Sequence, residues 1–405
     1  MRAANYDEFE LAEKRPPSRW ELDQAAPYNP VILVHRTGQH CVLNSLALQQ
    51  TNITSQTPDP PGGTIPRDSE TGEPTGLIFG PNDMLVKAIP RIDKEEFRQG
   101  LNLADQKYLS LGITSLQDTG WDNGLDHWQR LQALIEQGDL TPRYSMFTGT
   151  GALEDFRRLG LSTGSGNNRL RLGGAKIALD ETTVCFHPPQ EDINQLAFKA
   201  VQAGFQLAFH VSDVHMLKAA LTAIKFVARE MPRPDSRPRL EHCSVCPPDL
   251  LPGLKASRAI VACQPSFLYY LGPRYLDEVS PAQLQWIFPF GSYCQSGIKM
   301  AFGSDSPFMP CNPLTGIYAA VTRKVISGPA LALTEKISLL DAIKMYTLGG
   351  AYASFEEGLK GSITPGKLAD LIVLSDDIFQ VAFEDIKDLK VERTIIGGRT
   401  VWKSD

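Results

Sequence analysis

The sequence predicts an α/β fold, a TIM-like (β/α) barrel, and two observations carry this prediction. From about residue 100 onwards, apolar strand-like runs alternate with amphipathic helical stretches, which is typical of βα units around a parallel sheet. Polar residues stand at the carboxyl ends of these runs, where a barrel places its catalytic groups. A doubly wound sheet usually has a glycine-rich first turn, and no G-x-G-x-x-G follows any run.

Seven runs predict strands, one fewer than a closed barrel needs. They span residues 112–118, 143–149, 172–179, 205–211, 239–244, 259–265 and 299–305. Residues 1–95 do not follow the repeat, and their Pro/Gly-rich turns predict an insertion or cap region that wraps the surface. Residues 356–405 predict short antiparallel strands outside the barrel, so the barrel itself is expected over residues 96–355.

The composition excludes several classes of protein. The chain has 405 residues, 42% of them hydrophobic, a net charge of −6 and a pI near 5.7, which predicts neither a nucleic-acid partner nor an anionic membrane partner. No apolar stretch approaches the ~18 residues of a membrane-spanning helix, and the first residues lack the apolar core of a signal peptide. Seven cysteines without a regular spacing do not predict a disulfide framework. We therefore expect a cytoplasmic protein.

Two histidines and an aspartate at strand ends predict a metal site. His210 and His242 each end a strand and are 32 residues apart, close to one βα repeat, so neighbouring strands would hold both imidazoles together. A lone strand histidine is more often a hydrogen-bonded core residue, but two imidazoles and the carboxylate of Asp305 suit zinc or a similar divalent ion.

Lys176 lies in an apolar strand, where an unpaired lysine is costly to bury. It could pair with Asp180 or Glu181, or it could be carbamylated and act as an anionic ligand that bridges two metal ions. The residues alone favour the salt bridge.

Four further residues are candidates for binding substrate. A helix that begins near Cys41 would place His40 near its N-terminus and Asn44 one turn on, so that both could face a ligand, although a capped surface helix fits the spacing equally well. Gln264 ends the sixth strand run, and Arg274 follows it in an aromatic segment, where it could bind a carboxylate.

The order of these segments resembles a known family. "GITSLQDTG", "GAKIALDETT", "FQLAFHVSD", "RLEHCS", "VACQPSFL", "FGSDSPFMPCNPL" and "GSITPGKLADLIVLSDD" follow one another as in the amidohydrolase superfamily. The segments "ELDQAAPYNPVILVHRTGQHCVLNSLAL" and "GGTIPRDSETGEPTGLIF" resemble the branch of N-substituted formamide deformylase, often called amidohydrolase family three.

This resemblance implies a metal-dependent hydrolase with one or two divalent ions, and zinc is the expected metal. It implies a barrel with a small β-sandwich made from both chain ends, in which residues 96–355 hold barrel strands two to eight and residues 356–405 hold the C-terminal part of the sandwich. Lys176, His210, His242 and Asp305 occupy four of the family's metal-site positions, and Asp305 would take the proton from the attacking water.

One departure from the family is large. The His-x-His pair of its first barrel strand occurs nowhere in the sequence, and we expect that strand to be missing. His35 and His40 do not replace the pair, because residues five apart face opposite sides of a strand and Thr37-Gly38 would break it.

Two functions follow from this reading. The first is hydrolysis of a carbon–nitrogen bond in a small non-peptide amide, N-formyl or N-acyl compound by metal-activated water. The alternative is a truncated or degenerate homologue that binds metal weakly or not at all and acts as a non-catalytic binding protein. An open barrel would also expose two strand edges, which a second copy of the chain could cover as a homo-oligomer.

Overall fold

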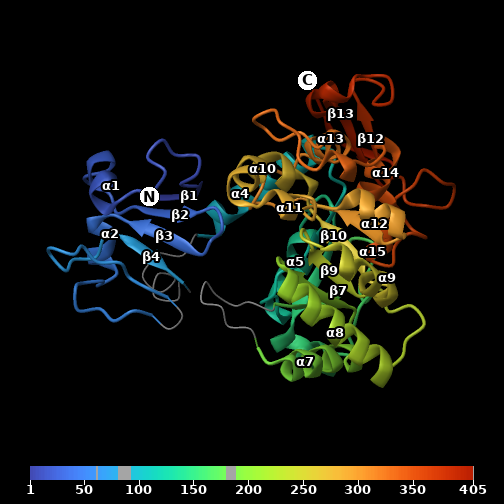
Figure 1. Cartoon of the computed structure of the whole chain (residues 1–405), viewed down its shortest axis with the longest axis horizontal. Coiled ribbons are helices and arrows are strands. Elements are labelled where there is room, and N and C mark those ends of the chain that lie inside the picture. The colour runs from blue at the N-terminus through green and yellow to red at the C-terminus, as the bar shows by residue number, and fades with distance from the viewer. Residues whose placement is uncertain (61–62, 81–92, 179–187, 405) are drawn as a thin grey trace. The chain divides into compact units, whose positions relative to one another are not determined.

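The computed structural model describes residues 1–60, 63–80, 93–178 and 188–404, and the chain divides into two compact units (Figure 1). The described residues up to Glu96 form unit 1, and those from Phe97 onwards form unit 2. No helix among the described residues is both long and apolar enough to cross a membrane.

Unit 1 is built on a four-stranded mixed sheet with the order β1-β2-β3-β4. Strand β2 runs parallel to β1 and antiparallel to β3, and β3 runs antiparallel to β4. Buried aliphatic side chains from β2, β3 and β4 form its core with those of the second helix. The bounds are β1 (Arg2–Tyr6), α1 (Arg19–Ala25), β2 (Ile32–His35), β3 (His40–Leu43), α2 (Ser45–Gln50) and β4 (Leu77–Phe79).

A tight turn at Gly38 joins β2 to β3. Gly38 donates its N–H to the carbonyl of His35 at 2.9 Å, and its φ of +71° lies in the left-handed region that favours glycine. The chain therefore reverses between His35 and His40, which end and begin the two paired strands.

Unit 2 contains a seven-stranded parallel sheet with the order β11-β10-β9-β8-β7-β6-β5, and this confirms the seven predicted strands and the α/β fold. The bounds are β5 (Ser115–Asp118), β6 (Arg143–Gly149), β7 (Leu170–Ile177), β8 (Leu207–Val211), β9 (Arg239–His242), β10 (Ile260–Cys263) and β11 (Lys299–Phe302).

The sheet is curled rather than flat. Arg239 on β9 donates a hydrogen bond from Nη1 to Oε1 of Gln117 on β5 at 2.5 Å, although β6, β7 and β8 lie between these strands. Neighbouring strands are ~4.8 Å apart, so a flat sheet would separate β5 from β9 by roughly 19 Å. The contact therefore requires the curvature of a TIM-like barrel, with β5 and β11 as the outer strands of the sheet.

Amphipathic helices follow the strands and supply the outer layer of unit 2 (Figure 1). In α8, the N-cap Asp213 accepts a hydrogen bond from the Met216 N–H at 2.8 Å, and a buried stripe from Met216 to Val227 recurs at helical spacing. The bounds are α4 (Lys94–Ser110), α5 (Leu125–Glu136), η1 (Thr150–Ala152), α6 (Leu153–Arg158), α7 (Gln190–Gln202), α8 (Val214–Glu230), η2 (Pro248–Leu250), α9 (Leu251–Ser257), α10 (Pro265–Glu278), α11 (Pro281–Leu284), α12 (Phe290–Ser296), α13 (Pro313–Thr322), η3 (Leu333–Glu335), α14 (Leu339–Lys344), η4 (Met345–Gly349), α15 (Gly350–Ala353) and η5 (Phe383–Asp388).

A three-stranded antiparallel sheet of the last strands also belongs to unit 2. It contains β12 (Leu371–Leu374), β13 (Val391–Ile396) and β14 (Arg399–Lys403). Just before β12, Asp370 accepts hydrogen bonds from Arg143 of β6 at 2.6 and 2.8 Å. The antiparallel strands are as predicted, and the β-sandwich stays a prediction.

Candidate metal centre

Four predicted site residues lie at the carboxyl-terminal end of the parallel sheet. Lys176 is the penultimate residue of β7, His210 lies on β8, His242 ends β9, and Asp305 follows β11 by three residues. Since all these strands run in the same direction and are neighbours in the order β11-β10-β9-β8-β7, their side chains gather at one end of the barrel.

The two imidazoles contact each other directly. The ring centroids of His210 and His242 are 4.6 Å apart in an edge-to-face arrangement. Nδ1 of His242 lies 2.8 Å from Oε1 of Gln264, whose amide nitrogen donates to the carbonyl of Ala262. Gln264 thereby presents its oxygen to the ring, so Nδ1 carries the proton and Nε2 keeps a free lone pair.

Burial keeps both histidines neutral. Burial, together with the nearby His242 and Lys176, lowers the pKa of His210 to about 3. Burial also lowers the pKa of His242, although the carboxylate of Asp305 opposes the shift. Neutral imidazoles are the form that binds metal ions.

Lys176 is only 5% exposed, and its charged neighbours are not the residues that the sequence predicts. Burial lowers its pKa, while the carboxylates of Glu241 and Asp305 raise it. Glu241 in turn accepts two hydrogen bonds from Arg239, at 2.7 and 3.0 Å. The expected partners Asp180 and Glu181 lie outside the described residues, so the predicted salt bridge stays untested.

Arg239 and Glu241 could have been found from the sequence. They stand at alternate positions of an otherwise apolar strand, with Leu240 between them, and alternate residues of a strand point to the same face. Two charged residues on one face of a buried strand indicate an ion pair inside the barrel, here with side chains 4% and 6% exposed.

Asp305 keeps solvent access at the end of the barrel, yet its surroundings change its acidity. The protein groups around the carboxyl group partly desolvate it and raise its pKa, and the nearby His242 and Lys176 lower this pKa again without cancelling the shift. A carboxyl group with a raised pKa is a better proton acceptor when ionised, which suits a general base.

The donor set fits a divalent ion by its chemistry. Two neutral imidazoles and one carboxylate are ligands that zinc and neighbouring first-row metals prefer. The ligand atoms of His210, His242 and Asp305 are not all within 4.8 Å of one another, and among the described residues only Glu8, His35 and His40 form a group that meets this spacing. The barrel residues would therefore have to move closer together around an ion.

The structure corrects the helix predicted around His40 and Asn44. Helix α2 begins at Ser45, not near Cys41, and His40 lies on strand β3. The Asn44 side chain is fully buried and caps α2: its oxygen accepts from the N–H groups of Ala47 and Val31. Its amide nitrogen donates to the carbonyl of Asn29, so this side chain serves the backbone of unit 1.

The geometry expected for His35 and His40, on opposite sides of one strand, was wrong, whereas it stays a prediction that they do not replace the His-x-His pair. The prediction treated them as members of one strand, whereas the Gly38 turn folds the segment into a hairpin. Their rings stack with centroids 4.1 Å apart. Two apolar runs around a short segment with glycine are a hairpin signal, and that signal was present in "VILVHRTGQHCVL".

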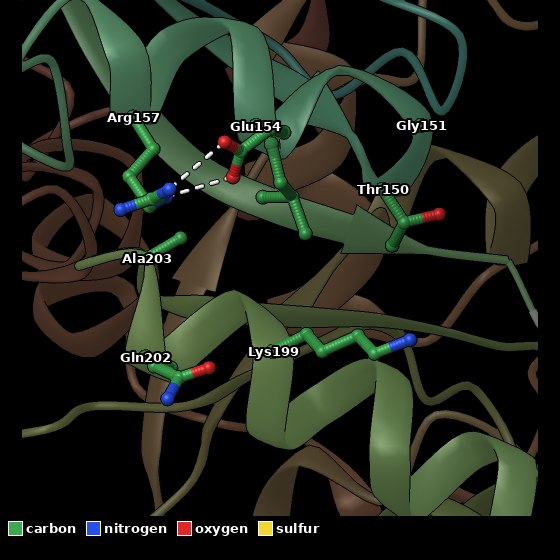
Figure 2. Close-up of a pocket in the computed structure, with 8 residues that line it drawn as sticks. Thr150, Gly151, Glu154, Arg157, Lys199, Gln202 and Ala203 are labelled. Carbon is green, nitrogen blue, oxygen red and sulfur yellow. Dashed lines mark hydrogen bonds and ion pairs between the residues drawn. The ribbon is translucent and has the colours of Figure 1, made fainter.

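Arg274 lies on the exposed side of α10, where it forms an ion pair with Glu278 at 2.9 Å. A surface pocket lies elsewhere, between α6 and α7, and Figure 2 shows the Arg157–Glu154 ion pair at its edge. None of the predicted site residues lines this pocket, whose lining residues are Thr150, Gly151, Leu153, Glu154, Arg157, Lys199, Gln202 and Ala203.

Comparisons with known proteins agree with this architecture. The model of a family described as the amidohydrolase family matches residues 2–402. Bacillus subtilis YtcJ, whose name is that of an amidohydrolase, is 28% identical over 98% of this chain and 78% of its own length. The N-substituted formamide deformylase of Arthrobacter pascens is 26% identical over the same shares.

A solved structure shares the fold. An uncharacterized metal-dependent hydrolase from Pyrococcus horikoshii OT3 superposes with a TM-score of 0.73 at 23% identity, over 95% of this chain and 78% of that chain. The curled seven-stranded sheet and its helices therefore belong to a TIM-like α/β fold.

Proposed function

The chain belongs to the amidohydrolase family, and from this premise we propose that it hydrolyses a carbon–nitrogen bond in a small non-peptide amide, N-formyl or N-acyl compound. The observation that carries the proposal is the pair of neutral imidazoles, His210 and His242, gathered with Lys176 and Asp305 at the carboxyl end of one barrel. The name of the Arthrobacter relative supports the N-formyl class of substrate.

We assign the metal ligands to Lys176, His210, His242 and Asp305, with zinc as the metal and one or two ions per chain. A bound divalent ion supplies Lewis-acid polarisation of the substrate carbonyl and makes water more acidic. Lys176 would be a ligand after carbamylation, because the carbamate is anionic. The lowered pKa of its buried amine favours the neutral form that reacts with CO2.

Asp305 acts as the general base in this proposal. One of its carboxylate oxygens takes a proton from the attacking water while the water oxygen bonds to the carbonyl carbon. The same carboxyl group then gives the proton to the leaving nitrogen as the carbon–nitrogen bond breaks. Gln264 holds the ring of His242 through Nδ1, and we assign Gln264 and Arg274 to contacts with the substrate.

The test is hydrolysis of a substrate panel by the purified chain, reconstituted with zinc and counted for bound metal. N-formyl amines, N-acyl amines and dipeptides would be compared, and we expect turnover of the first two. Turnover of dipeptides alone would overturn the non-peptide assignment. A chain that neither binds metal nor turns over any substrate would instead support the alternative, a non-catalytic homologue.

Asp305→Asn tests the base directly. Loss of a general base typically costs about 10²–10⁴-fold in rate, so kcat should fall by this factor while circular dichroism stays unchanged. The matched control is Asp126→Asn, because Asp126 is a solvent-exposed carboxylate on α5 and its loss should leave kcat unaltered. Equal activity of the two variants would refute the role of Asp305.

A further inference from the structure

Glu8, His35 and His40 form a compact cluster within unit 1. Glu8 follows strand β1, His35 ends β2 and His40 begins β3. Oε2 of Glu8 lies 3.2 Å from Nε2 of His35 and 4.0 Å from Nε2 of His40. All three ligand atoms lie within 4.8 Å of one another.

The His40 side of the cluster is buried and short of hydrogen bonds. His40 is 8% exposed, and among the described residues nothing hydrogen-bonds to its Nε2 or to Oε2 of Glu8, although both atoms are shielded from water. An unsatisfied buried polar atom costs about 1–3 kcal/mol. Nε2 of His40 and Oε2 of Glu8 are 4.0 Å apart, so a single bound group between them could satisfy both.

Among the described residues, aromatic rings pack around the two histidines. The ring of Tyr6 packs edge-on against both histidine rings, and Phe79 packs against His40. The side chain of Glu8 keeps 24% of its surface exposed, so the carboxylate forms the solvent side of an otherwise aromatic enclosure. Burial and the neighbouring His35 lower the pKa of His40, which keeps its imidazole neutral.

We propose that Glu8, His35 and His40 bind a divalent first-row transition-metal ion, such as zinc, at a site formed wholly by residues of unit 1. Two imidazole nitrogens and one carboxylate oxygen are a known ligand set for these ions. Ligand atoms around a tetrahedral zinc lie roughly 3.3–3.5 Å apart, given bonds of about 2.0–2.2 Å. The Glu8–His35 spacing of 3.2 Å is close to this range, and the Glu8–His40 spacing of 4.0 Å is longer, so His40 would have to move closer around an ion. Three protein ligands would leave a fourth tetrahedral position for water.

The hairpin supplies the support that such ligands need. Nδ1 of His35 accepts a hydrogen bond from the Thr37 N–H at 3.2 Å and lies 2.7 Å from Oγ1 of Thr37, so the turn fixes the orientation of this ring. The two rings now stack with an angle of 17° between their planes. A metal ion lies in the plane of each imidazole that binds it, so binding would open the stack.

The experiment separates this site from the barrel site. The substitutions His210→Ala and His242→Ala in the full chain remove both barrel imidazoles. Co2+ is then titrated into this variant while the visible absorption of the bound ion is recorded. We expect about one Co2+ per chain, with the absorption of an ion bound by nitrogen and oxygen. Adding Glu8→Gln to this chain should weaken Co2+ binding at least about tenfold, which is what losing even a supporting group costs.

Glu10→Gln is the matched control, because Glu10 is an exposed carboxylate of the same segment that pairs with Arg36, and it should not change the affinity. A second measurement avoids the double barrel variant: Glu8→Gln alone should hold about one zinc fewer per chain than the unaltered protein. Unchanged Co2+ affinity in Glu8→Gln, or no Co2+ bound once the barrel imidazoles are gone, would overturn the proposal.

Discussion

Single side chains determine how His242 can act, and Gln264 is the most important of them. Its amide oxygen accepts from Nδ1 of His242 at 2.8 Å, and its amide nitrogen is held by the carbonyl of Ala262. The hydrogen bond selects the tautomer that leaves Nε2 available. Gln264 is therefore a positioning residue for the proposed metal centre as well as a predicted contact of the substrate.

Gln264→Leu should weaken zinc binding at the barrel about 10–100-fold, because removal of the partner that orients a ligating histidine typically has this effect. Competition with a chromophoric chelator measures the affinity. Gln264→Glu keeps an acceptor for Nδ1 and should restore most of it. If Gln264→Leu binds zinc as tightly as the unaltered chain, Gln264 does not orient His242.

At the scale of single residues, the sequence predicted which residues are candidates better than it predicted which side chains they contact. His210, His242 and Asp305 could be proposed as site residues because each stands where an apolar run stops. The partners of Lys176 could not be found in the same way, since Glu241 is 65 positions away and reaches it only through the order of the strands. The pairing of His35 with His40 depended on recognising a turn instead of a broken strand.

Among the elements, the strands of the barrel were predictable and those of unit 1 were less so. A buried parallel strand is apolar along its length, as in Ile260–Cys263, where every residue is buried. Strand β1 has four exposed residues out of five, so no alternation of apolar and polar residues marks it. Its place comes from pairing with β2, a contact across about 30 residues.

The Arg143–Asp370 ion pair connects strand β6 to the segment before β12. Both side chains are buried, at 7% and 5% exposure. Asp370→Asn should lower the free energy of unfolding of unit 2 by about 3–5 kcal/mol, because it leaves a buried guanidinium without its counter-charge. Urea denaturation measures this. Glu278→Gln, which breaks the exposed pair with Arg274, is the control and should cost less than about 1 kcal/mol.

The same pair predicts a dependence on pH. Burial alone raises the pKa of Asp370, but the hydrogen bonds from Arg143 and from the Gly397 N–H lower it overall, below its ordinary value of 3.8. A lowered folded-state pKa means that the stabilisation is complete above the unfolded pKa and is lost as the pH falls through the folded pKa. The unaltered chain should therefore lose its advantage over Asp370→Asn below about pH 4, and a constant difference would contradict this.

For the molecule as a whole, the main finding is two compact units with separate cores. Residues 1–95 are separable from the barrel in the sequence because the βα repeat begins after them, but the four-stranded sheet within them was not expected. The outer strands β5 and β11 of the parallel sheet are where a second copy would bind. The homo-oligomer and the cytoplasmic location stay predictions.

Two cores predict two thermal transitions in calorimetry. Leu43→Ala removes a side chain that is 1% exposed in the core of unit 1, and Leu240→Ala removes one that is 0% exposed in the core of unit 2. Each should cost about 2–5 kcal/mol and shift only the transition of its own unit. A single transition that both variants lower equally would show that the units unfold together.

The hydrogen bond between Gln117 and Arg239 also has a consequence for folding on the ribosome. The two residues are 122 positions apart, and synthesis at about 5–20 residues per second places roughly 6–24 s between their appearances. During that interval the amide oxygen of Gln117 on β5 has no Arg239 guanidinium from which to accept a hydrogen bond. Contacts of such long sequence separation form slowly because a large loop must close first. The interior of the barrel is thus completed late, after the strands between β5 and β9 have been made.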